Sequence, residues 1–141
     1  MAEFTYAAAQ IVANGENVLL NETPITPSRC IVHRDGSGIV TLRGLTNCQS
    51  RARFRVGFGA NIAVPTGGTA GPISIALAIA GEPLPASRAI ATPAAAAEYH
   101  NVYVDTFVDV PAGCCATIAV ENTSGADISV QNANLIVTRE G

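Results

Sequence analysis

Apolar and polar residues alternate one by one along several segments of this chain. In residues 51–58, alanine, phenylalanine and valine occupy every second position, and arginines occupy three of the positions between them. Residues 101–110 repeat the pattern, with valine or threonine at the even positions and mostly aromatic or acidic residues at the odd ones. A period of two places successive side chains on opposite faces of an extended strand. These segments therefore predict β-strands with one buried face.

Turn residues divide the rest of the chain into short extended segments. The pairs Asn14-Gly15 and Asp35-Gly36 are strong turn signals, because these residues readily adopt the positive φ of tight hairpin turns. Further turn signals lie at residues 81–83, 111–113 and 122–125. Helical periodicity is absent, except that residues 94–99 fit one helical turn. The spacing predicts an all-β, single-domain jelly-roll sandwich of about 8–10 antiparallel strands.

Residues 72–80 differ from a half-exposed strand, because both of their predicted faces are apolar. One face carries isoleucine and leucine, and the other carries only serine and alanine. We therefore expect both faces to be covered, either by the same chain or by another subunit. Two aromatic residues of 101–110 add to this apolar surface, and aromatic residues are enriched in interfaces. The candidates for a subunit interface around a threefold axis are Ser74, Ala76, Ala78, Ala80, Tyr103 and Phe107.

The low charge of the chain favours a subunit of an assembly. Only 13% of the 141 residues are charged, the mean hydropathy is +0.30, and the chain has arginine but no lysine. This composition excludes a disordered chain, and the net charge of −3 argues against nucleic acid as a partner. No run of apolar residues is long enough to span a membrane, so we expect no membrane partner. Apolar surface in such a chain is usually covered by a partner.

The first residues show neither a basic region nor a long apolar run. We therefore expect no secretory signal peptide and synthesis in a cytoplasm. We expect residues 1–14 to form an N-terminal arm that docks on another protein, and residues 15–141 to form the jelly-roll domain.

Three arginines, Arg51, Arg53 and Arg55, share one face of their predicted strand. Guanidinium groups pair well with carboxylates, so this face is a candidate contact for an anion or a protein partner. The alternative is a solvated face that discourages strand aggregation. Asp105 and Asp109 share a face of another strand, but two carboxylates supply too few oxygens for calcium.

No catalytic, cofactor or metal site is expected. His33, Asp35 and Ser37 lie within one hairpin and lack the turn that presents a catalytic serine. The glycine-rich residues 66–72 are not followed by a helix that begins with lysine, so they are not a phosphate-binding loop. We therefore predict that the protein is not an enzyme and holds no cofactor.

Four cysteines are present: Cys30, Cys48, Cys114 and Cys115. They allow three intramolecular connectivities, and the sequence does not choose between disulfides and buried thiols. Their spacing and that of the two histidines do not match a zinc site.

Several short motifs, taken in order, resemble the complement-globular-domain and tumour-necrosis-factor superfamily of trimeric jelly rolls. Residues 8–21 resemble its first strand, residues 53–58 its aromatic-rich central strand, and residues 133–139 its closing strand. Residues 75–83 and 108–113 are similar to two of its strand-to-turn segments. The chain differs from the animal members in having no tryptophan and no collagen stalk. The resemblance implies a homotrimer that functions in display or adhesion.

The alanine-rich, lysine-free composition is similar to that of phage fibre or decoration proteins and of the globular heads of bacterial spore-surface proteins. This resemblance implies a structural protein of a phage virion, as a head fibre, decoration protein or fibre tip, with other virion proteins as partners. The alternative is an adhesin module of the same fold on a bacterial cell or spore surface. In that case the outward loops, residues 66–72 and 86–100, would contact a host-surface glycan.

Overall fold

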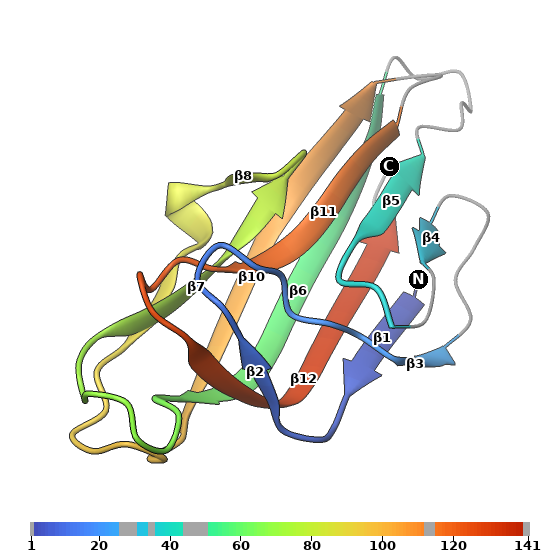
Figure 1. The fold of residues 1–141 in the computed structure, drawn as a ribbon. Helices are drawn as coiled ribbons and strands as arrows, with labels where there is room; N and C mark the ends of the chain where they lie inside the picture. The colour runs from blue at the N-terminus through green and yellow to red at the C-terminus, as the bar shows by residue number, and fades with distance from the viewer. Residues whose placement is uncertain (1, 26–30, 34–35, 44–50, 112–114, 140–141) are drawn as a thin grey trace.

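The chain folds into two antiparallel β-sheets that face each other across one hydrophobic core (Figure 1). The computed structural model describes residues 2–25, 31–33, 36–43, 51–111 and 115–139. Within these residues no α-helix occurs, and the one helical element is a short 3-10 turn, η1 (Pro85–Ser87). The prediction of an all-β jelly-roll sandwich is confirmed.

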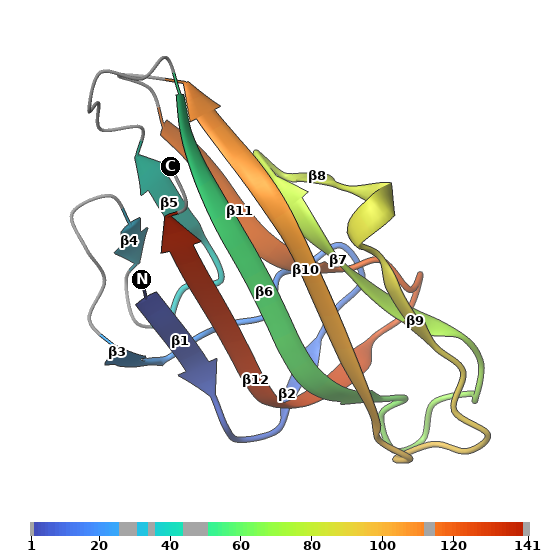
Figure 2. The ribbon, with the colours of Figure 1, turned by 180° about the vertical axis from the view of Figure 1, so that it is seen from behind.

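The first sheet has the strand order β10-β6-β12-β1-β3, and β2 pairs with the part of β12 that β1 leaves open. Figure 2 shows its long strands side by side. The strands are β10 (His100–Pro111), β6 (Arg51–Ala63), β12 (Ile128–Arg139), β1 (Ala2–Tyr6), β3 (Glu22–Ile25) and β2 (Gln10–Val12).

The second sheet has the order β4-β5-β11-β7-β8, with β9 also paired to β7. Its strands are β4 (Ile31–His33), β5 (Val40–Arg43), β11 (Cys115–Asn122), β7 (Ile73–Ile79), β8 (Glu82–Pro83) and β9 (Ala89–Ala91). The described residues thus form 12 strands, more than the 8–10 expected. The excess comes from short edge strands such as β8 and β9. β12 remains one strand through a β-bulge at Asn132 (φ 56), where its partner changes from β2 to β1.

The alternation in the sequence becomes the core. Phe54 and Phe58 of β6 are fully buried and pack in one cluster with Leu135 of β12. Ile75 and Leu77 of β7 join the same cluster from the second sheet. The first six residues of β7 are all buried, so the expectation that both of its faces are covered is confirmed.

Residues 1–14 do not form a separate arm in the part of the chain that is described. β1 lies between β12 and β3 within the first sheet, and Phe4 is fully buried in the core. β2 continues the same sheet. Ala2 and Phe4 belong to the buried hydrophobic cluster, and whether residues 1–14 also dock on another protein stays a prediction.

The expected turns largely agree with the structure. Gly15 and Gly36 have φ values of 79° and 90°, and β4 and β5 form the antiparallel hairpin predicted around Asp35-Gly36. The helical turn predicted for residues 94–99 does not form: residues 94–97 are bends and turns, with Ala97 at φ 62°, and residues 98–99 are irregular. The 3-10 turn lies earlier, at η1, because Pro85 fixes the backbone of its first residue.

Candidate functional site

The most unusual surface of the protein is the solvent-facing side of the first sheet, formed mainly by β10, β6 and β12 (Figure 2). Tyr103 and Phe107 of β10 are 61% and 59% exposed, and Ile136 of β12 is 37% exposed. We call this patch the outer face. Its residues are Arg53, Arg55, Gly57, Gly59, Tyr103, Asp105, Phe107, Asp109, Ile136 and Thr138.

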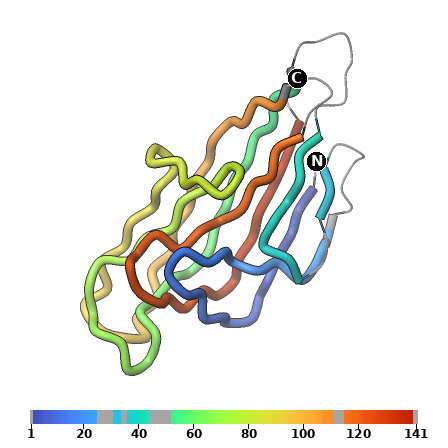
Figure 3. The backbone as a smooth tube through the Cα atoms, turned by 45° about the horizontal axis from the view of Figure 1, so that its top comes forward, coloured from blue at the N-terminus to red at the C-terminus, as the bar shows by residue number. Residues whose placement is uncertain are grey.

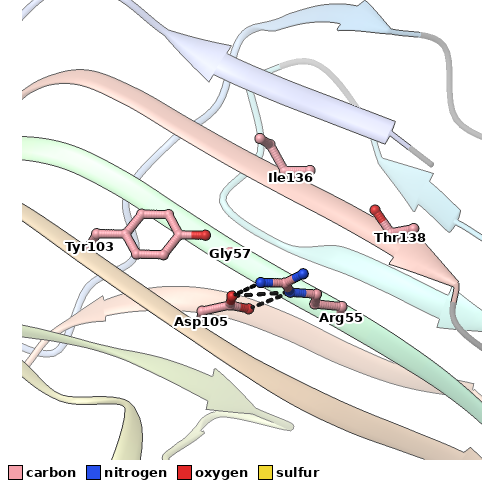
Figure 4. A pocket seen from close by; sticks show the side chains of 6 residues that line it. All are labelled: Arg55, Gly57, Tyr103, Asp105, Ile136 and Thr138. Atoms are coloured by element: carbon pink, nitrogen blue, oxygen red, sulfur yellow. Dashed lines mark hydrogen bonds and ion pairs between the residues drawn. The ribbon is translucent and has the colours of Figure 1, made fainter.

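Two glycines shape the middle of the outer face. Gly57 and Gly59 follow Arg55 on β6 and bring no side chain to the surface. Tyr103 pairs with Gly59 across the strands, and its ring leans toward Gly57 (Figure 4). Beside the ring lies a shallow hollow of about 240 Å³, lined also by Ile136 and Thr138. The result is a flat area of backbone and aromatic ring rather than a ridge of side chains.

Two ion pairs lie at one end of this flat area, toward the start of β6. The Arg53 guanidinium donates two hydrogen bonds to Asp109, with its Nε 2.8 Å from Oδ1. Arg55 binds Asp105 in the same way, with Nη2 2.6 Å from Oδ2 (Figure 4). The hydrogen bond to Asp109, and then its negative charge, raise the pKa of Arg53 above its ordinary value.

Both Asp105 and Asp109 are therefore occupied by arginines, which accounts for their poor fit to a calcium site. No group of three or more His, Cys, Asp or Glu residues in the described part of the chain is arranged to hold a metal. The side chain of Arg51 lies outside the described residues. Arg53 and Arg55 are on the outer face as the alternation predicted, and their role as an anion or partner contact stays a prediction.

The six residues expected to form one interface are divided between the two sheets and one turn. Ser74, Ala76 and Ala78 of β7 are buried within the single chain, and Ser74 bonds to Thr123 through its hydroxyl. Ala80 lies in the turn that follows β7 and is exposed. Only Tyr103 and Phe107 belong to the outer face. Whether any of the six contacts another copy stays a prediction.

His33 and Ser37 contact their own hairpin and Phe4 of β1. The Nε2 atom of His33 is 2.8 Å from the carbonyl oxygen of Ser37, and its ring lies 4.5 Å from that of Phe4. The hydroxyl of Ser37 accepts a hydrogen bond from the backbone N–H of Ile39. Asp35 lies outside the described residues, so the arrangement seen is structural for the other two.

The prediction of disulfides or buried thiols is tested at one cysteine only. Cys115 is exposed at the start of β11, and Cys30, Cys48 and Cys114 lie outside the described residues. In the part of the chain that the structure describes, no helix is long and apolar enough to cross a membrane.

A second surface feature lies at the loop end, opposite the start of β1 and the end of β12 (Figure 3). Residues 64–69, 71–73 and 126–127 line a hollow of about 450 Å³ there. A neighbouring hollow of about 310 Å³ includes Ile11, Tyr99 and Ser129. The sequence predicted outward loops in this region. It did not indicate that residues from β2 and β12 complete the hollows, because their pairing is long-range.

Comparisons with solved structures agree with the sandwich fold described above. Murine APRIL superposes with a TM-score of 0.64 at 14% identity, covering 97% of this chain and 98% of its own. The globular domain of zebrafish complement 1qA superposes with a TM-score of 0.53 at 9% identity, covering 96% and 94%. The chain has the jelly-roll fold of the tumour-necrosis-factor and complement 1q type. Its fold therefore agrees with the resemblance seen in the sequence motifs.

This likeness is one of fold. No protein-family model and no curated relative matches the sequence. At these identities the shared jelly roll does not transfer a ligand, because one fold supports many unrelated sites. The function is therefore argued from the surface of this chain.

Proposed function

We propose that this protein is a non-enzymatic structural module whose copies associate through the outer face. The observation that carries the proposal is the exposure of Tyr103 and Phe107, about three-fifths each, on a long, regular sheet. Large aromatic side chains and arginine are enriched at the centres of protein interfaces, where they contribute most of the binding energy. Here they occur together on one face.

A second copy of the same chain is the partner that fits best. The ion pairs on the outer face balance each other, Arg53 with Asp109 and Arg55 with Asp105. A copy of the face therefore brings no net repulsion from these groups and offers both charge signs to each partner. Gly57 and Gly59 let the Tyr103 ring lie close to β6, so the face presents this ring to a partner rather than protruding β6 side chains.

We place three copies in the assembly on the basis of the resemblance to trimeric jelly rolls. The role proposed is that of a phage virion protein, such as a head fibre, decoration protein or fibre tip, with localisation on the virion. Other virion proteins would then dock at the end where β1 begins and β12 ends, which leaves the loop end outward (Figure 3).

Native mass spectrometry and sedimentation at micromolar concentration test this proposal. A stable trimer supports it. A monomer at every concentration contradicts self-association, and a different oligomer contradicts the threefold arrangement. Imaging of virions labelled with an antibody to the protein tests the virion role separately.

The hollows at the loop end favour a second candidate function. They lie away from the chain termini, where a displayed module meets its surroundings (Figure 3). An adhesin that binds a host or cell surface, on a virion or on a bacterial cell or spore, would use this end.

A further inference from the structure

The two hollows at the loop end share one wall. Val64, Pro65 and Thr66 line both of them, so the two hollows adjoin at this short segment. The backbone fixes the wall on each side. The amide of Ala97 donates to the carbonyl of Val64 at 2.7 Å, and the amide of Gly68 donates to that of Pro65 at 2.9 Å. The two hollows are therefore neighbours at the loop end.

The larger hollow offers small polar groups on a glycine-rich floor. Thr66, Thr69 and Asp127 supply two hydroxyls and a carboxylate, while Pro72 and Ile73 add apolar surface. Gly67 has a φ of 88°, which glycine adopts without strain, and this allows a tight turn in the loop that lines the hollow. The volume of about 450 Å³ lies within the range of about 300–1,000 Å³ typical of small-molecule sites.

The smaller hollow offers an aromatic ring in a fixed position. Tyr99 is partly exposed, and its hydroxyl lies 2.7 Å from that of Ser129. This hydrogen bond holds the ring at the side of the hollow. Ile11, an exposed residue of β2, lines the same hollow. An aromatic ring beside hydroxyl groups suits a flat, hydroxyl-rich ligand, because such a ligand has both apolar and hydrogen-bonding faces.

A network of hydrogen bonds makes the far wall rigid before any ligand arrives. The buried Asn122 side chain donates to the carbonyls of Val12 and Ala126, at 2.9 and 2.7 Å, and accepts from the amide of Ser124. The amide of Gly125 donates to the side chain of Asn14. Ala126 and Asp127 are therefore presented by a loop that is tied to β2 and to its own strand. Preorganisation of this kind lowers the entropic cost of binding.

We infer that these two hollows bind a neutral saccharide of at least two sugar units, one in each hollow. The inference rests on the second function proposed above, adhesion through the loop end. Asp127 accepts hydrogen bonds from sugar hydroxyls, and Tyr99 packs against a sugar ring. None of the described residues lining either hollow is Lys or Arg. A sialylated, uronic or sulfated glycan would therefore meet Asp127 without a compensating cation.

Binding of the full-length protein to an array of neutral and acidic oligosaccharides, followed by titration of the best neutral one, tests the inference. Asp127→Ala and Tyr99→Ala each reduce affinity at least tenfold. The matched control Glu82→Ala removes an exposed carboxylate from β8, away from the hollows, and leaves affinity unchanged. Tyr99→Phe retains the ring but loses the hydrogen bond to Ser129, so we expect its affinity to lie between those of the wild type and Tyr99→Ala. Native mass and the urea midpoint of each variant show that the fold and assembly are intact.

The outcomes separate this inference from the adhesin function. Preferred binding of acidic glycans, or neutral binding that neither variant weakens, overturns the saccharide site and leaves adhesion standing. Attachment to cells that survives removal of their glycans does the same. Failure to bind any glycan or any cell overturns both.

Discussion

The ring of Tyr103 lies so close to Gly57 that a Cβ atom at position 57 would be 2.6 Å from its hydroxyl oxygen. A Cβ at Gly59 would be 3.4 Å from the ring, an ordinary contact. The position of the ring on the outer face therefore requires glycine at position 57 but not at position 59. The difference provides a matched pair of variants.

Gly57→Ala is expected to displace Tyr103, while Gly59→Ala leaves it in place. The displaced ring no longer matches the partner surface, so we expect the dissociation constant of the assembly to rise about tenfold, equal to about 1.4 kcal/mol. The unfolding free energy of the monomer changes by less than about 1 kcal/mol, because removing a strand glycine is itself favourable. Sedimentation measures the first effect and urea unfolding the second. Equal effects of the two variants on assembly would contradict the role of the ring.

Phe107→Ser is expected to weaken self-association with little effect on the folded monomer. Phe107 is 59% exposed, so the monomer loses little buried area, whereas an interface would lose an aromatic anchor worth about 2 kcal/mol or more. Ile90 on β9 is 62% exposed but belongs to the other sheet, and Ile90→Ser is the control. Native mass spectra across a dilution series compare the two. A trimer unaffected by Phe107→Ser would exclude the outer face as the interface.

Charge reversal tests whether the ion pairs of the outer face contribute to the interface between copies of the chain. Asp109→Arg places a second positive charge beside Arg53, and like charges brought together in an interface are unfavourable. We expect this variant to assemble poorly. The double variant Arg53→Asp with Asp109→Arg restores the local pair in reversed order, and we expect it to recover at least part of the assembly. Sedimentation at low and high salt provides the measurement. Wild-type behaviour of the single variant would show that the pair is remote from any interface.

Local pattern was sufficient to predict which side of a strand is buried. The alternation in residues 51–58 placed Phe54 in the core and Arg53 in solvent, as observed. The same reasoning predicted that β7 is buried on both faces. These predictions succeed because the period of two follows from backbone geometry alone.

Local pattern did not reveal which strands lie in the same sheet. Ala76 and Tyr103 were expected on one surface, yet β7 pairs with β11 and β10 pairs with β6. The place of β1 between β12 and β3 was missed for the same reason, because β12 is more than 100 residues away and β3 follows only after β2. Strand pairing is decided by long-range packing of the core, which an alternating pattern does not encode.

Asn122→Ala is expected to lower the unfolding free energy by about 1–3 kcal/mol. The substitution leaves the carbonyls of Val12 and Ala126 without their buried donor, and unpaired buried groups retain their cost of desolvation. Asn61→Ala is the control. Its amide contacts Asn132 and Asn101 at 3.2 Å in exposed positions, so its effect stays within about 0.5 kcal/mol. The urea midpoint at constant slope distinguishes the two. A small effect at Asn122 would contradict the rigid loop end described above.

Ala80→Asn is expected to stabilise the protein. Ala80 and Gly81 form the two-residue turn between β7 and β8, with φ values of 53° and 85°. An L-residue other than glycine in this left-handed region costs roughly 1–2 kcal/mol, and asparagine tolerates it better than alanine. Asn-Gly is also the preferred pair for a hairpin turn with two positive φ angles. We expect a gain of about 0.5–1 kcal/mol in unfolding free energy by urea titration.

Ala86→Asn is the matched control for this gain. Ala86 is exposed in η1 and is not among the described residues with positive φ, so the same change of side chain brings no relief of backbone strain there. We expect no stabilisation from it. The backbone amide of Ala80 donates a hydrogen bond to the carbonyl of Thr117 in β11. A distorted turn would therefore also weaken this contact between the turn and β11. Equal gains from both substitutions would mean that asparagine acts through solubility or the unfolded chain, and the turn would then carry no strain to release.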